Sequence, residues 1–441
     1  MKVTIIGAGS VVFAKRLISD ILSYPELIGT TFSLMDINED RLLTAEKMAL
    51  SLIEQNGNIA TVETHQNQRD ALKGASYVIN LIQVGMHEST LIDFEIPKKY
   101  GLKQTIADTL GVGGVFRALR TIPVVLDICR DMEEVCPDAL LLNYTNPMAA
   151  LILAIEKATS IKTVGLCHSV QNTAGELAGY LNLPAEELEY KVAGINHMAW
   201  FLELKHKGKD LYPALFEAMK DPAIYKKDKV RFEMMNRLNY FITESSEHLS
   251  EYTPYFIKRD SLIEDFSIPI DEYIRRSEAN LKHFEETKEK IENNIPFHTE
   301  ESHEYGAPII HSMETGVNRE IWGNVLNTNL ITNLPTNACV EVPCLVNKRG
   351  IQPTHIGDLP PQLAAMNRTN INVQQLIVEA VLTGNIDHVY QAVMLDPHAS
   401  SVLSLEEIWD MTSELLEAHK QHLPKFTKGR HLQYKKSVTI G

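Results

Sequence analysis

A thiol and an imidazole in this sequence have the chemistry of a catalytic metal site. Cys167 and His168 come directly after an apolar run, and His197 follows at the end of a second, glycine-containing stretch. A thiolate and an imidazole bind transition metals, and a set of only two protein ligands leaves coordination positions open for a substrate. Taken alone, each residue is equally typical of a buried core side chain. The sequence has no Cys-x-x-Cys pair of the kind that holds structural zinc, so Cys167 and His197 favour a catalytic rather than a structural metal.

A glycine turn near the N-terminus is typical of dinucleotide binding. Gly7, Gly9 and Ser10 lie between a β-branched run and a helical pattern. Glycines let the backbone turn tightly and approach a pyrophosphate, whose charge the helix N-terminus attracts. The third glycine of the usual pattern is replaced by Val12, but Asp36 follows the next apolar run, as the pattern requires. An acidic residue there can bind ribose hydroxyls and would repel a 2′-phosphate, which favours NAD over NADP.

Three further stretches carry polar side chains suited to a sugar or to proton transfer. Asn146 follows an apolar run, where its amide could bind a polyhydroxylated ligand or cap a helix that we expect Pro147 to begin. Residues 108–117 form a glycine-rich loop entering a helix, and it could be a flap over a ligand or a plain loop. Residues 243–252 could supply a general base or simply begin a solvated helix. The residues alone leave these alternatives open.

The elements that must position these side chains alternate regularly through the first part of the chain. Strands are expected at 2–6, 32–36, 77–82, 139–143 and 162–166, with helices at 10–24 and 39–55. This alternation indicates an α/β fold with a Rossmann-type doubly wound parallel sheet. Ligands of such sheets bind beyond the carboxyl ends of the strands, where Asp36, Asn146 and Cys167 all fall. We therefore predict an NAD-binding domain at residues 1–170.

The pattern changes after residue 170 and predicts an α+β domain at residues 171–441. A strand hairpin is expected at 190–205, mostly charged helix at 215–300, short apolar runs at 322–346 and a closing helix at 403–418. We expect this part to bind the substrate and the metal and to mediate oligomerisation. A basic stretch at 425–436 is expected to be a solvated end.

Composition excludes several classes of function. The chain has 441 residues, enough for two or three domains, and a formal net charge of −15, which argues against nucleic acids and anionic membranes as partners. No apolar run approaches the ~20 residues needed to span a bilayer, and the N-terminus does not read as a signal peptide. Five cysteines without disulfide-like spacing favour a reducing compartment, so we expect a cytoplasmic protein.

Longer stretches of the sequence resemble glycoside hydrolase family four, the NAD- and manganese-dependent glycosidases, and within it the α-galactosidase (melibiase) branch. Cys-His after the strand, in place of cysteine-asparagine or cysteine-aspartate, separates the chain from the 6-phosphoglycosidase branches of that family. The stretches that carry the resemblance are GAGSVVF at 7–13, QTIADTLGVGGVFRALRTIP at 104–123, NYTNPMA at 143–149, VGLCHSV at 164–170, AGINHMAW at 193–200, TESSEHLSEYTP at 243–254 and NLPTNACVEVPCLV at 333–346.

The resemblance implies a lactate/malate-dehydrogenase-like overall architecture and a set of residue roles. In this family Cys167 and His197 would bind Mn²⁺, Asn146 would contact the sugar, and His168 would donate a proton to the leaving group. Family members are oligomers, so a homodimer or homotetramer is expected. The base of this family is not a single residue type, and its candidates here are, in order, His248, Glu247 and Tyr252.

The implied mechanism differs from hydrolysis by two carboxylates. NAD⁺ takes a hydride from C3 of the sugar, and the resulting ketone acidifies the proton on C2. A base removes that proton while Mn²⁺ stabilises the enediolate, and the glycosidic oxygen leaves with help from His168. Water then adds, and NADH returns the hydride, so no net oxidation occurs.

Several alternatives to an α-galactosidase remain at this stage. Relatives with the same core act on α-glucosides or uronides. A plain NAD-dependent 2-hydroxy acid dehydrogenase and a non-catalytic NAD-binding sensor would share the architecture. A free sugar is favoured over a 6-phosphate because no clear basic cluster is present, although Arg117, Arg120 or Arg319 could bind a phosphate.

Overall fold

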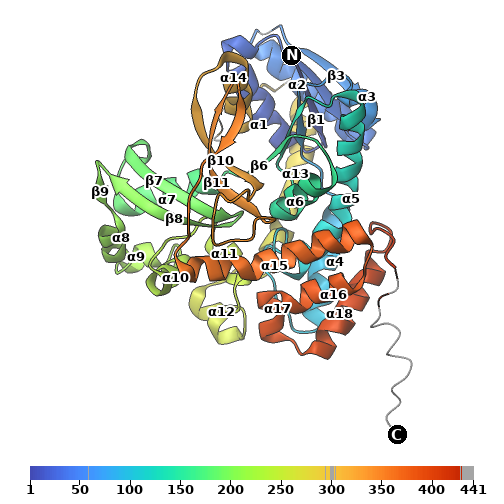
Figure 1. Ribbon diagram of the computed structural model, residues 1–441. Coiled ribbons are helices and arrows are strands. Elements are labelled where there is room, and N and C mark those ends of the chain that lie inside the picture. The colour runs from blue at the N-terminus through green and yellow to red at the C-terminus, as the bar shows by residue number, and fades with distance from the viewer. Residues whose placement is uncertain (58, 294, 298–301, 303, 428, 430–441) are drawn as a thin grey trace.

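The structure is a computed structural model that describes residues 1–441 except 58, 294, 298–301, 303, 428 and 430–441. Within the described residues one mixed sheet runs through the molecule in the order β3-β2-β1-β4-β5-β6-β10-β11-β7-β8-β9, with β12 paired to β11. Figure 1 shows helices on the outside of this sheet and a group of C-terminal helices, α15 to α18, beside α4 and α5.

The strands and helices have the following bounds. The strands are β1 Lys2–Ile6, β2 Thr31–Met35, β3 Thr61–His65, β4 Tyr77–Asn80, β5 Leu140–Asn143, β6 Thr163–Leu166, β7 Leu188–Ile195, β8 Met198–His206, β9 Lys209–Asp210, β10 Arg319–Leu326, β11 Cys339–Asn347 and β12 Gly350–Pro353. The helices are α1 Val11–Leu22, α2 Glu39–Gln55, α3 Gln68–Leu72, α4 Met86–Lys99, α5 Gly111–Val135, α6 Met148–Ala158, α7 Ser169–Leu181, α8 Tyr212–Ala218, α9 Pro222–Tyr225, α10 Lys229–Leu238, α11 Ser246–Tyr252, α12 Asp260–Phe266, α13 Glu272–Glu292, α14 Gly306–Thr315, α15 Pro361–Thr383, α16 Asp387–Leu395, α17 Pro397–Val402 and α18 Leu405–Ala418, with short 3₁₀ helices at Pro25–Leu27 and Ala185–Glu187.

The first six strands form the predicted parallel sheet. β1 pairs in parallel with β2 and β4, and β4 continues through β5 to β6. The five strands expected from the sequence are confirmed as β1, β2, β4, β5 and β6. Most of their residues are buried, as is typical of a parallel sheet that is covered on both faces. β3 was not predicted, since its sequence Thr-Val-Glu-Thr-His alternates and lies half exposed at the sheet edge.

The sheet does not stop at residue 170. β10 pairs antiparallel with β6, joining Gly323 to Leu166, and β11, β7 and β8 extend the sheet further. The predicted hairpin at 190–205 is confirmed as β7 and β8, and the short runs at 322–346 are β10 and β11. Residues 1–170 and 171–441 therefore share one sheet, and their division into two domains stays a prediction.

Helices from the second part of the chain cover the first part. α15 packs against α5 and α6, and α18 packs against α4 (Figure 1). α18 is the predicted closing helix, and it begins with a capping box between Ser404 and Glu407. Most of the basic stretch at 425–436 lies outside the described residues.

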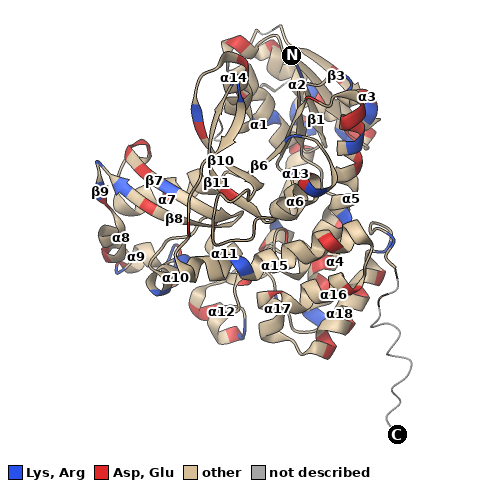
Figure 2. Ribbon diagram, in the orientation of Figure 1, with Lys and Arg blue, Asp and Glu red and all other residues tan. Residues whose placement is uncertain are grey.

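Charge is distributed unevenly over the outer elements. Figure 2 shows basic and acidic residues side by side on α3 and on the β7–β8 hairpin, whereas the charged side chains of α12 and α18 are all acidic. Within the part of the chain that the structure describes, no helix combines the length and the apolar character needed to cross a membrane.

Candidate functional site

The carboxyl ends of the parallel strands meet at one edge of the sheet, where the candidate residues gather. Gly7, directly after β1, has a φ of +82°, and a Cβ there would lie 3.0 Å from the backbone nitrogen of Ile82, just after β4. The Thr145 hydroxyl, from the segment after β5, donates to the Ile82 carbonyl at 3.1 Å. Gly7 therefore permits a turn that packs tightly against the neighbouring strand ends.

The predicted dinucleotide residues are brought together at this edge. The Gly9 N–H donates to Asp36 Oδ2 at 2.8 Å, and the Asn38 N–H donates to Asp36 Oδ1 at 2.9 Å. A Cβ on Gly9 would lie 2.5 Å from that Asp36 oxygen, so the position has room only for glycine. Ser10 is exposed and directly precedes α1, so the N-terminus of α1 lies at the same turn. The arrangement fits a dinucleotide, with free backbone approach at the turn and a carboxylate held in place beside it.

Cys167 and His197 come together as the metal hypothesis requires. Cys167 follows β6, and His197 lies in the tight turn between β7 and β8 with a φ of +61°. The Sγ of Cys167 is 3.3 Å from Nε2 of His197, and both side chains are almost completely buried. Burial, with a smaller contribution from Glu244, raises the pKa of the Cys167 thiol to about 12. A cation at this position would be needed to keep the sulfur ionised at neutral pH.

Glu244 adds a carboxylate that the sequence reasoning did not single out. Its Oε2 is 3.5 Å from Nε2 of His197, and donor atoms of Cys167, His197 and Glu244 all lie within 4.8 Å of one another. Burial opposes ionisation of Glu244, but the neighbouring imidazoles of His197, His248 and His168 outweigh it and lower its pKa to about 2. The titratable stretch at 243–252 indicated a site, but the sequence did not indicate which of its carboxylates would face Cys167 and His197.

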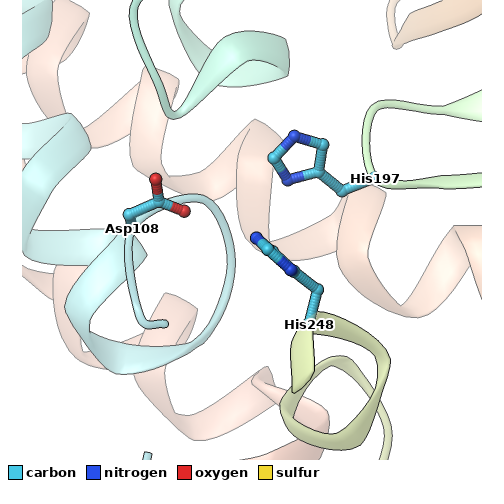
Figure 3. A group of neighbouring side chains, drawn as sticks. All are labelled: Asp108, His197 and His248. Atoms are coloured by element: carbon cyan, nitrogen blue, oxygen red, sulfur yellow. The ribbon is translucent and has the colours of Figure 1, made fainter. Parts of the chain in front are cut away.

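A second group surrounds the same imidazole. Figure 3 shows Asp108, from the loop before α5, and His248, from α11, both pointing toward His197. The Ser245 hydroxyl is 2.7 Å from Nδ1 of His248. Burial lowers the pKa of His248 to about 4, so this imidazole is neutral at neutral pH and can accept a proton.

The loop that carries Asp108 is fixed rather than free. The Glu251 carboxylate accepts the backbone N–H groups of Thr105 at 2.9 Å and Ala107 at 2.7 Å. The glycines expected in a loop at 108–117 belong instead to the first turns of α5, which begins at Gly111. A Cβ on Gly113 would lie 2.5 Å from the Ala107 carbonyl oxygen, so glycine allows the loop to fold back onto the helix. Neither the flap nor the plain loop describes this segment.

Asn146 points into the site and does not cap the next helix. Its Nδ2 donates to Asp108 Oδ2 at 3.3 Å, while its Oδ1 is buried and has no partner among the described residues. α6 begins at Met148, one residue later than expected, and Pro147 precedes it without a side-chain cap. The Arg117 Nε donates to the Asn146 carbonyl at 3.3 Å and fixes this segment. An unpartnered amide oxygen fits a residue that hydrogen-bonds a hydroxylated ligand.

His168 is paired with a carboxylate from a distant part of the chain. Its Nδ1 is 3.3 Å from Oε1 of Glu304, and its side chain is 43% exposed. The hydrogen bond to Glu304 raises the pKa of His168 to about 9, so the imidazole is protonated at neutral pH. A charged, partly exposed imidazole beside Cys167 is suited to donate a proton to a leaving group.

The other candidates for the base differ in their surroundings. The Tyr252 hydroxyl is 3.2 Å from Nδ1 of His197, and burial raises the pKa of this phenol well above its usual value. Glu247 contacts the loop through its backbone, since its carbonyl accepts the Thr105 hydroxyl at 2.8 Å. His248 and Tyr252 are therefore the two candidates whose side chains reach His197.

Comparison with known proteins agrees with this arrangement. Residues 2–183 match the model of "family 4 glycosyl hydrolase", and residues 192–399 match that of the "family 4 glycosyl hydrolase C-terminal domain". An α-galactosidase of Bacillus subtilis is 50% identical over 429 residues, which cover 96% of this chain and 99% of the relative. An α-galactosidase of Rhizobium meliloti is 37% identical, covering 96% of this chain and 89% of the relative.

Solved structures agree in fold over nearly the whole chain. The putative glucosidase lplD of Bacillus subtilis has a TM-score of 0.86 at 25% identity and covers 94% of this chain and 99% of its own. A 6-phospho-α-glucosidase from gut microorganisms, solved in complex with NAD and Mn²⁺, has a TM-score of 0.81 at 18% identity, with coverages of 97% and 99%. The malate dehydrogenase of Cryptosporidium parvum has a TM-score of 0.54 at 14% identity, with coverages of 87% and 99%, which bears out the dehydrogenase-like architecture as a likeness of fold alone. The two family models together span most of the sequence, and the chain belongs to family 4 of the glycosyl hydrolases.

Proposed function

We propose that this protein hydrolyses α-galactosides of the melibiose type and that it uses NAD and Mn²⁺ to do so. The observation that carries the proposal is the 3.3 Å approach of the Cys167 sulfur to the His197 imidazole, beyond the end of β6. A sulfur and a nitrogen held together and open to further ligands suit a catalytic cation. The α-galactosidase relatives at 50% and 37% identity support the choice of sugar.

The residues at the site fit both NAD and Mn²⁺. Gly7, Gly9, Ser10 and Asp36 would hold NAD at the turn after β1, and Cys167 and His197 would hold the metal. When bound, NAD⁺ supplies a hydride acceptor for the sugar and Mn²⁺ supplies a Lewis acid for neighbouring sugar oxygens.

The protein's own residues then orient the sugar and move protons. Asn146 would bind a sugar hydroxyl with the amide oxygen that lacks a partner among the described residues. His168, protonated through its contact with Glu304, would donate to the glycosidic oxygen as that oxygen leaves. The mechanism thus needs an acid on one side of the sugar and a base that reaches the proton on C2.

His248 is our first choice for that base. It is buried, neutral at neutral pH and directed toward His197 and Asp108 (Figure 3). Tyr252 is the second choice, because its hydroxyl contacts His197 and would first have to lose its own proton. Exchange of the C2 proton with D₂O separates the two candidates, tested by the variants His248→Gln and Tyr252→Phe. The variant that removes the true base should stop deuterium incorporation at C2, whereas the other variant should only slow it.

A free sugar fits the site better than a 6-phosphorylated one. Each of the three arginines named as candidates for binding a phosphate is engaged within the protein. Arg120 is buried and paired with Asp93 at 2.6 Å, Arg117 donates to the Tyr273 hydroxyl at 2.7 Å, and Arg319 donates to the Ser312 hydroxyl at 2.9 Å. Glu244 adds a negative charge beside the metal residues, which would repel a nearby phosphate.

The deciding experiment is a panel of p-nitrophenyl glycosides with NAD⁺, Mn²⁺ and a thiol. We expect release from the α-galactoside, loss of release after chelation and recovery with Mn²⁺. Faster release from an α-glucoside or an α-galacturonide would reassign the sugar while keeping the mechanism. Activity that survives chelation, or no release from any glycoside, would contradict the proposal. The cytoplasmic location, the homodimer or homotetramer and the oligomerisation role of residues 171–441 stay predictions.

A further inference from the structure

We propose that Glu244 is a third protein ligand of the divalent cation, beside Cys167 and His197. The inference rests on the proposed function only in assuming that a cation binds there. With Cys167 and His197 alone, the cation would depend on the sugar for its remaining ligands. With Glu244 as a third donor, the protein can bind the cation without the sugar.

The distances around His197 fit a shared ion. Its Nε2 is 3.3 Å from the Cys167 sulfur and 3.5 Å from Oε2 of Glu244. Two donors that bind one metal at roughly 2.0–2.3 Å cannot be more than about 4.5 Å apart, and both contacts meet that condition. Both also involve the same ring nitrogen, so sulfur and carboxylate approach the same side of the imidazole.

Two chain segments are connected so that Glu244 faces His197. The Thr243 N–H donates to the Ala199 carbonyl at 2.8 Å, and the Ala199 N–H donates to the Thr243 hydroxyl at 3.1 Å. This pair fixes the residue before Glu244 to the residue two positions after His197. Glu244 itself has a φ of +74°, a conformation that a non-glycine residue adopts only where its surroundings hold it.

Arg231 holds the backbone of Glu244 and leaves its carboxylate free. The guanidinium of Arg231 is buried. Its Nη1 donates to the Glu244 carbonyl, and its Nε donates to Asp228 Oδ1 at 2.8 Å. The Glu244 side chain is only 19% exposed, and among the described residues its ion-pair partners are two imidazoles, His197 at 3.5 Å and His248 at 3.6 Å. A mostly buried carboxylate needs a positive partner. A divalent cation bound also by the Cys167 thiolate would supply that charge and be neutralised by the two anions.

The competing role for Glu244 is a contact to the sugar. A sugar contact would affect substrate binding but would leave the affinity of the free protein for the metal unchanged. Cation binding in the absence of sugar and NAD⁺ therefore separates the two roles.

The test is a titration of the metal-stripped full-length protein with Mn²⁺, in which the electron paramagnetic resonance signal of unbound Mn²⁺ reports the free concentration. Glu244→Gln preserves the size of the side chain and removes its charge, and we expect it to weaken Mn²⁺ binding by about ten-fold or more. Cys167→Ser is the positive control. Glu176→Gln is the matched control. Glu176 also contacts Arg231, with its carboxylate 2.6 Å from the guanidinium, but it is 46% exposed and does not belong to the group of Cys167, His197 and Glu244.

Retained NAD⁺ binding and an unchanged circular dichroism spectrum would show that Glu244→Gln is folded. Equal Mn²⁺ affinity in the wild type and Glu244→Gln would overturn the inference while leaving the proposed function intact. A wild type that binds no Mn²⁺ with or without sugar would contradict the proposed function and this inference together.

A measurement on the wild type alone covers the case of a variant that fails to fold. In protein labelled with ¹³C at the glutamate side-chain carboxyls, electron–nuclear double resonance of bound Mn²⁺ without sugar should show one strongly coupled carbon. A spectrum without that coupling would overturn the assignment of Glu244.

Discussion

His168 and Glu304 form an ion pair between the segment after β6 and the segment before α14, with Nδ1 and Oε1 3.3 Å apart. The two residues are far apart in sequence and meet only because β10 places the second part of the chain beside β6. The pair keeps the imidazole charged, which is the state that a proton donor requires.

The effect of replacing His168 on activity should depend on the leaving group. We expect His168→Gln to reduce kcat/KM for melibiose on the order of 100-fold, because a sugar alkoxide leaves poorly without a proton. The same variant should lose much less on p-nitrophenyl α-galactoside, whose phenolate leaves readily. Glu304→Gln should also lose more activity on melibiose than on p-nitrophenyl α-galactoside, but both losses should be smaller than in His168→Gln. Equal losses on both substrates would contradict the assignment of His168.

Metal removal should be reversible and should spare cofactor binding. Chelation should abolish hydrolysis while NAD⁺ binding, followed by fluorescence, remains, because the glycine turn and the Cys167 pair are separate parts of the site. Air oxidation should have a similar effect, since an oxidised Cys167 no longer provides a thiolate. Thiol and Mn²⁺ together should restore activity. Recovery with Mn²⁺ alone after oxidation would show that the sulfur is not needed.

Gly9→Ala should weaken cofactor binding specifically. The new Cβ would lie 2.5 Å from Asp36 Oδ2 and would displace the carboxylate that we expect to bind the ribose. We expect the Kd for NAD⁺ to rise by about ten-fold or more. Gly175→Ala is the matched control, because Gly175 lies in α7 and a Cβ there meets nothing within 4 Å. Isothermal titration with NAD⁺ measures both, and equal effects would contradict a special role for the turn.

Acid should destabilise the protein partly through His398. Burial lowers the pKa of His398 to about 4 from 6.5, although its contact with the Ile257 carbonyl opposes the shift. The unfolded chain therefore takes up this proton first, so the contribution of His398 is present above about 6.5 and is lost as the pH falls toward 4.

Neighbouring Asp396 acts in the opposite sense, because burial raises its pKa to about 6, so a difference between variants is the cleaner measurement. Relative to the wild type, His398→Gln should gain up to about 3 kcal/mol in the free energy of unfolding as the pH falls through this range. Guanidinium melts at several pH values measure it. A difference that does not change with pH would show that His398 is not buried in its neutral form.

Much of the sheet and part of the site could be predicted from local sequence. Strands such as β1 and β5 are short, mostly apolar and buried, and the sequence alone indicates them. Cys167 and Asn146 could be placed because residues after parallel strands share one edge of the sheet. Local sequence marked His197 as a ligand type, and its pairing with Cys167 followed from the family resemblance rather than from the strand pattern. That approach depends on β7 joining the sheet through β11 and β10.

The residues that sequence reasoning missed act through distant partners. Glu244, Glu251 and Glu304 lie in polar stretches that equally suit a solvated helix or loop, and each acquires its place only from tertiary contacts. Residues 108–117 were expected to form a glycine-rich loop, and the difference from the structure also arises from tertiary contacts. Glycines are typical of loops, but Gly113 here lies in a helix and makes room for the Ala107 carbonyl of a packed segment.

The hydrogen bonds between β6 and β10 also determine whether the chain can be divided. A fragment that ended at residue 183 would leave the backbone of β6 exposed as a bare edge strand directly beside Cys167. Such an edge invites pairing with another chain, so we expect the isolated fragment of residues 1–183 to aggregate rather than remain a dispersed monomer.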